Sequence, residues 1–72
     1  MRTKGIELLM PLQIYKDVAV CDGKIEIAGH IYHSKELEKY DQQNIIVREY
    51  ETELIMFDMN LRYICSIDKQ IL

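Results

Sequence analysis

The sequence contains no tryptophan, one phenylalanine, one proline and two cysteines in 72 residues. A chain of this length forms one small domain with a thin core, because a domain of roughly 60 residues buries only about 60% of the surface that its unfolded chain exposes. Dinucleotide-binding folds and TIM barrels need much longer chains. We therefore expect the chain to catalyse no reaction by itself and, if it belongs to an enzyme, to be a part of one.

The sequence also lacks an excess of positive charge and any long apolar run. Twelve Asp and Glu residues oppose nine Lys and Arg, for a net charge of −3, which argues against a strongly electrostatic binder of nucleic acid or membrane but leaves room for a local basic face. No run approaches the roughly 20 apolar residues of a membrane helix. We expect a soluble, cytoplasmic chain with no membrane partner, in which Cys21 and Cys65 are free thiols in the core.

Short β-strand patterns begin in the first half of the chain. Residues 18–21 are small or β-branched and precede Asp22-Gly23, a dipeptide that strongly indicates a two-residue hairpin turn. Ile25 and Ile27 then alternate with charged residues, as in a strand with one buried face. Gly29 interrupts this alternation and indicates a bulge or sharp bend that lets a small sheet curl, with the strand resuming beyond it.

The second half adds a short helical turn and three more strands. Ser34 precedes residues 35–40, where Leu37 and Tyr40 recur at three-residue spacing, which indicates an N-capped turn. Strand patterns occupy 44–50, 54–57 and 62–66, and Asn60 is expected to adopt positive φ in the last turn. Strands this short must close on themselves to hide their edges. The expected fold is all-β: a small antiparallel β-barrel of five to six short strands with one short helical turn.

Several short motifs recur in a familiar order. The stretch 24–37 (KIEIAGHIYHSKEL), with Val47-Arg48, Met56-Phe57-Asp58 and the closing strand 62–65, resembles the C-terminal β-barrel domain of phage Mu-type DDE transposases and their integrase-core relatives. The stretch 8–11 is similar to the segment that joins the catalytic core to that barrel. The resemblance covers about residues 6–68, with two departures: Glu49 stands where the family usually has tyrosine, and Asn60-Leu61 replaces its glycine turn.

The resemblance implies a domain plan and a role. Residues 1–13 would be a linker or lead-in from a preceding catalytic core, which this chain does not contain, residues 14–69 the Mu-transposase-like barrel, and residues 70–72 a tail. The family's catalysis lies in an RNase H-like core, where three acidic residues hold divalent metals. The barrel would support transposition through weak, non-specific DNA contacts and through assembly with other transposase protomers.

Five basic residues are the candidates for such contacts, because they sit on or beside expected strands, where an outward-facing row could touch phosphates without reading sequence. They are Lys16, Lys24, Arg48, Arg62 and Lys69. The alternative is a protein-interaction module that docks on transposase subunits or on an AAA+ ATPase that delivers target DNA, with no DNA contact of its own, and the acidic balance favours it slightly. A free-standing phage or bacterial barrel is a third possibility.

Other side chains are interpreted as structural, and no metal or cofactor is expected. The acidic residues at 36, 38, 49, 51 and 53 have the spacing of a solvated surface. His30, His33, Cys21 and Cys65 could supply four zinc ligands, but their spacing suits no zinc ribbon, and residues 30 and 33 point to opposite faces of a strand. Tyr32 and Tyr63 are expected in the core. The remaining tyrosines (Tyr15, Tyr40 and Tyr50) stay open between core packing and base stacking.

Overall fold

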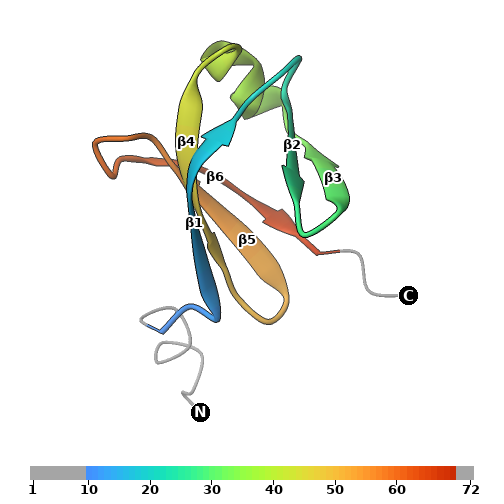
Figure 1. Cartoon of the computed structure of the whole chain (residues 1–72), viewed down its shortest axis with the longest axis vertical. Coiled ribbons are helices and arrows are strands. Elements are labelled where there is room, and N and C mark those ends of the chain that lie inside the picture. Colours follow the sequence, from blue (N-terminus) through green and yellow to red (C-terminus); the bar gives the residue numbers. More distant parts are fainter. Residues whose placement is uncertain (1–9, 70–72) are drawn as a thin grey trace.

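The computed structural model describes residues 10–69 (Figure 1). Its elements are β1 (Gln13–Ala19), β2 (Lys24–Ile27), β3 (His30–His33), the 3₁₀ helix η1 (Lys35–Tyr40), β4 (Asn44–Glu49), β5 (Glu53–Phe57) and β6 (Tyr63–Asp68). They form an antiparallel four-stranded sheet in the order β1-β4-β5-β6 and a separate β2-β3 hairpin. The all-β class and the single short helical element are confirmed.

The expected barrel is not closed. Among residues 10–69 the hairpin pairs with no strand of the large sheet. The isolated bridge between Cys21 and Lys24 only closes the turn that leads from the segment after β1 into β2, while β3 pairs only with β2 and β6 only with β5. In Figure 1 the hairpin and η1 lie to one side of the four-stranded sheet. In the described residues, β3 of the hairpin and β6 of the large sheet therefore each keep one unpaired edge.

Two glycine-containing turns set the path of the hairpin. Asp22 and Gly23 have φ of 54° and 74°, and the N–H groups of Cys21 and Lys24 each donate to the other's carbonyl at 3.0 Å, so the predicted two-residue turn is confirmed. Of the two interpretations of Gly29, the bulge is wrong, and the sharp bend takes the form of a full reversal of the chain. With φ of 84°, and Ala28 at 53°, Gly29 completes a second two-residue turn between Ile27 and His30.

The first strand begins earlier than its pattern indicates. We expected it at residues 18–21, whereas β1 covers Gln13–Ala19 and pairs with β4 instead of β2. Its register shifts between Tyr15 and Val18, where Asp17 has φ of 57°. This bulge breaks the alternation from which a strand is recognised. Residue 13, which we expected in the lead-in, thus belongs to β1, whereas residues 1–9 of the expected lead-in and residues 70–72, the expected tail, lie outside the described residues.

The core lies between the four-stranded sheet and the elements that cover it. Ser34 caps η1 by accepting a hydrogen bond from the N–H of Glu36, as predicted, and η1 buries Leu37 completely. The other buried members of the cluster come from β2, β4, β5, β6 and the residue that follows β1: Val20, Ile25, Ile27, Ile45, Val47, Leu54, Met56 and Cys65.

The expectations for two tyrosines, the two cysteines and the last turn are confirmed only in part. Tyr32 packs against the core, as expected, but Tyr63 is 63% exposed. Both cysteines are free, yet only Cys65 is buried and Cys21 is exposed. Leu61, not Asn60, has the positive φ in the last turn. Asp58 causes this, since its carboxylate accepts hydrogen bonds from the N–H groups two and four residues later and folds the turn around itself.

Candidate functional site

The five predicted basic residues do not form one row. Lys16 lies on β1, Lys24 begins β2, Arg48 is on β4, Arg62 precedes β6 and Lys69 follows it. Two of them have intramolecular partners. The Lys69 ammonium lies 2.8 Å from a Glu49 carboxylate oxygen and donates to the Tyr50 carbonyl at 2.9 Å.

Arg48 is the second engaged residue. Its guanidinium carbon lies 4.7 Å from the centre of the Phe57 ring, a cation–π contact, and its Nε is buried without a hydrogen-bond partner among residues 10–69. Lys16, Lys24 and Arg62 are exposed and form no ion pair within the same range. Of the five predicted residues, these three are thus the ones available to a phosphate backbone.

Glu49 is the centre of a polar network, and the expectation of a solvated Glu49 is wrong. Register places it opposite Gln13 and Leu54, on the face of the sheet that carries the core. Its carboxylate pairs with Lys69 and accepts a hydrogen bond from the Tyr15 hydroxyl at 2.8 Å. The hydrogen bond from Lys69, followed by that from Tyr15, lowers the pKa of Glu49, and the same Tyr15 bond raises the pKa of the phenol.

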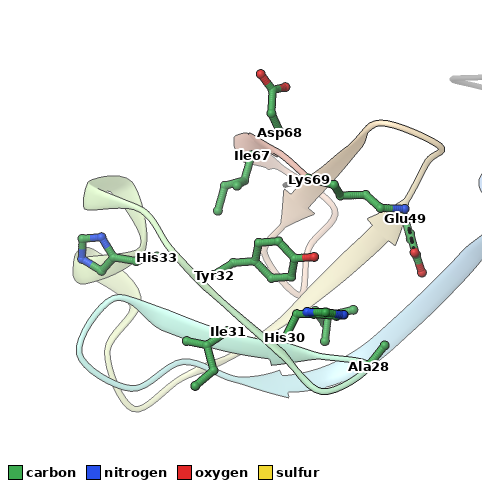
Figure 2. Close-up of a pocket in the computed structure, with 10 residues that line it drawn as sticks. Ala28, His30, Ile31, Tyr32, His33, Glu49, Ile67, Asp68 and Lys69 are labelled. Carbon is green, nitrogen blue, oxygen red and sulfur yellow. Dashed lines mark hydrogen bonds and ion pairs between the residues drawn. The ribbon is translucent and has the colours of Figure 1, made fainter. Parts of the chain in front are cut away.

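A groove of about 500 Å³ lies between β3 and β6, and we call it the seam because it separates the unpaired edges of these two strands. Figure 2 shows Tyr32 directed into it from β3 and Ile67 from β6, with the Glu49–Lys69 pair at one end. The sequence carries no direct signal of this groove, since it depends on which strands remain unpaired.

The face of the four-stranded sheet opposite the core carries a second feature, the outer face. Residues directly opposite in an antiparallel ladder project to the same side. One row runs Ile14, Arg48, Ile55, Ser66 and another Ile46, Phe57, Tyr63. The Phe57 and Tyr63 rings meet edge-on, with centroids 6.4 Å apart. The outer face, defined as Ile14, Ile46, Arg48, Ile55, Phe57 and Tyr63, is therefore apolar and aromatic around one arginine, and the acidic pair Glu53 and Asp68 projects to the same side at one end of the sheet.

The outer face was not predicted, although the sequence carries a signal for it. Residues 45–47 and 54–57 are continuous apolar runs, which indicate strands with apolar side chains on both faces instead of one. Alternate residues of these runs do face the core, with Val47, Leu54 and Met56 fully buried. The intervening ones, such as Ile46 and Ile55, remain partly exposed on the outer face.

Metal and membrane sites were sought in the same part of the chain. Among residues 10–69 no three His, Cys, Asp or Glu side chains are grouped to hold a metal ion. His33 instead lies 3.6 Å from a carboxylate oxygen of Glu38, on the surface. No helix within these residues is long and apolar enough to cross a membrane. Comparison with protein-family models, with curated proteins and with solved structures found no match.

Proposed function

We propose that this chain is an accessory, non-catalytic domain of a Mu-type DDE transposase, which supports DNA transposition by docking on a neighbouring protomer through the outer face. The family part of the proposal is supported by the places that the resembling motifs occupy. Gly29 forms a hairpin turn, Leu37 is buried under η1, Val47-Arg48 lies on an inner strand, and Phe57-Asp58 ends β5. Each motif thus serves a structural role in the order that the resemblance implies.

The observation that carries the docking mode is the stack of Arg48, Phe57 and Tyr63 on an apolar sheet face. Arginine and tyrosine are enriched where protein interfaces concentrate their binding energy, and charged residues are otherwise depleted from interface centres. Ile14 and Tyr63 are 45% and 63% exposed, so burying them removes apolar surface from water. A carboxylate on the incoming protomer would also accept hydrogen bonds from the Arg48 guanidinium, which is held over Phe57.

Weak DNA contact is the second candidate, and exposed Lys16, Lys24 and Arg62 favour it. Three cations on a chain of net charge −3 give a shallow dependence on salt, since each neutralised phosphate contributes a slope of about −0.9. Titration of labelled duplex DNA at low and then moderate salt tests this candidate. Absence of binding at low salt would exclude it and leave docking, on a protomer or on a target-delivery ATPase, as the mode of action.

The family assignment and the docking mode have separate tests. The reading frame upstream of Met1 is expected to encode an RNase H-like domain with three acidic residues, and its absence would contradict the assignment. In that parent enzyme, Ile55→Asp is expected to abolish assembly on transposon ends. Met59→Asp is the matched control, because Met59 is 51% exposed in the turn between β5 and β6 and belongs to neither row of the outer face. Equal assembly by both variants would refute docking through the outer face.

A further inference from the structure

The seam has an unpaired strand edge on each side. Among residues 10–69, β3 is paired on one edge by β2 and β6 on one edge by β5, and no backbone hydrogen bond joins β3 to β6. Unpaired strand edges are the surfaces to which extended peptides add. What matters for such addition is which N–H and C=O groups point into the groove.

On β3 those groups belong to Ile31 and His33. A two-residue turn makes the flanking pair, Ile27 and His30, mutually hydrogen bonded, and bonded pairs alternate along the ladder. His30 and Tyr32 therefore direct their backbone groups to β2. The bond from the Ser34 N–H to the Gly23 carbonyl, 3.1 Å long, continues the same alternation. Ile31 and His33 consequently direct theirs away from β2, toward the free edge.

On β6 the corresponding groups belong to Ser66 and Asp68. The N–H of Lys69 donates to the Thr52 carbonyl at 2.9 Å, which fixes the alternation against β5. Ile67, opposite Leu54, then directs its backbone groups to β5, and its two neighbours direct theirs outward. The side chains of Ser66 and Asp68 are exposed and leave this edge open.

The groove has the size of a short strand. One residue of an extended strand occupies about 160 Å³, taking a rise of ~3.3 Å, a strand spacing of ~4.8 Å and a layer depth of ~10 Å. The volume of about 500 Å³ thus accommodates roughly three residues, close to the four of β3. Tyr32 and Ile67 contact the core and form its inner walls.

The charges of the groove favour a peptide over a nucleic acid. The cation at its base, Lys69, is held by Glu49 at 2.8 Å, so no free ammonium is offered to a phosphate there. A charged inward side chain would lose its hydration without gaining a partner. An uncharged, β-branched side chain between Tyr32 and Ile67 suits these walls.

We propose that the seam is a strand-acceptor site: an extended segment of a partner protein, with an apolar β-branched residue facing inward, adds between β3 and β6 and joins the two sheets. The backbone of the added strand hydrogen bonds on both sides, to Ile31 and His33 and to Ser66 and Asp68. This site uses the backbone edge of β6 next to the outer face, and it does not depend on docking through the outer face or on the transposase assignment.

The test uses the whole chain and the peptide acetyl-Thr-Val-Thr-Val-Thr-amide at millimolar concentration. Amide hydrogen exchange, followed by NMR, is expected to slow as peptide is added, by a factor of 1 + [L]/Kd, where [L] is the free peptide concentration and Kd its dissociation constant. The affected amides are those of Ile31, His33, Ser66 and Asp68. The control peptide acetyl-Thr-Val-Pro-Val-Thr-amide lacks the central N–H and is expected to protect these amides much less.

Two variants complete the design. Ile31→Pro and Ser66→Pro each remove one outward N–H while leaving the ladder bonds of their strands in place, and each is expected to lose the peptide-dependent protection. If one variant fails to fold, the other and the peptide control still decide the outcome. Three results would overturn the proposal. The peptide could slow amide exchange only in β1, it could slow exchange equally in folded proline variants, or it could fail to slow exchange at any peptide concentration.

Discussion

Replacement of Glu49 by glutamine tests the polar network at the base of the seam. The Glu49 side chain is 21% exposed, and its partner Lys69 is 18% exposed, so the pair is more shielded from water than a surface ion pair. Glutamine keeps the shape and one acceptor oxygen but loses the charge. The substitution therefore isolates the electrostatic part of the two hydrogen bonds that Glu49 accepts from Lys69 and Tyr15.

The expected loss follows from these two bonds. Hydrogen bonds to charged groups contribute about 1.5–3 kcal/mol and neutral ones about 0.5–1.5 kcal/mol, so the Tyr15 bond, which becomes neutral, loses about 1 kcal/mol. The Lys69 bond keeps its charged donor and loses the attraction between opposite charges, up to about 1 kcal/mol. Partial exposure reduces this toward the smaller values of surface pairs. We expect Glu49→Gln to lower the free energy of unfolding at pH 7 by about 1–2 kcal/mol, and the melting temperature falls by roughly 4–8 °C for each kcal/mol in a domain of this size.

The pH dependence gives the prediction its sign. The folded pKa of Glu49 lies below its ordinary value of 4.5, so its contribution is fully present above the unfolded pKa and is lost as the pH falls through the folded pKa. The difference between wild type and Glu49→Gln is therefore expected at pH 7 and should shrink progressively below about pH 4.5. Urea unfolding followed by far-UV circular dichroism measures it, since the chain has no tryptophan.

Two control variants make this experiment decisive. Glu51→Gln removes the same charge from an exposed neighbour and should leave stability at pH 7 nearly unchanged. Lys69→Met should destabilise the wild type more than it destabilises Glu49→Gln, since the pair is already broken in the latter. A difference between wild type and Glu49→Gln that is the same at pH 7 and pH 3 would refute an electrostatic role for Glu49.

Three further predictions concern the core, the turns and the thiols. Leu37→Ala should cost about 2–5 kcal/mol in urea unfolding, because the side chain is fully buried; an unchanged midpoint would contradict its place under η1. Gly29→Ala should lower the free energy of unfolding by about 1–2 kcal/mol from its positive φ alone, because no atom lies within 4 Å of a Cβ built there. Gly23→Ala should lower it further, because a Cβ there would lie 2.8 Å from the Glu38 Cγ. Equal losses for the two variants would contradict this difference. Ellman's reagent should modify exposed Cys21 in the native protein, whereas Cys65, whose pKa is raised by burial, should react only on unfolding; simultaneous reaction would refute the core placement.

The parts of the fold that could be predicted are those determined by neighbouring residues. Asp22-Gly23 specifies its turn through the positive φ that both positions adopt, and Ser34 specifies the start of η1 through its own side chain. The start of β1 could not be predicted in this way. Its bulge at Asp17 shifts the side-chain alternation. The sequence of β1 therefore lacks the regular apolar–polar alternation from which a strand is predicted.

Features that depend on distant pairing could not be predicted locally. The closed barrel was predicted because unpaired strand edges are unfavourable. No residue near His33 or Asp68 in the sequence specifies whether β3 pairs with β6. Among the candidate site residues, the environment of Lys69 depends on Glu49, twenty residues away, and that of Arg48 on Phe57 in the neighbouring strand. Charge type was readable from the sequence, but the partners of each charge were not.

The Val47-Arg48 motif shows how the resemblance and the acidic charge can be reconciled. On β4, an inner strand of the sheet, successive side chains point to opposite faces. Val47 is fully buried in the core, and Arg48 stacks on Phe57 at the outer face. The dipeptide therefore has a structural explanation in which one residue builds the core and the next orders an apolar surface. An arginine used in this way needs no phosphate, so the motif is compatible with a chain of net charge −3 whose main contacts are with protein.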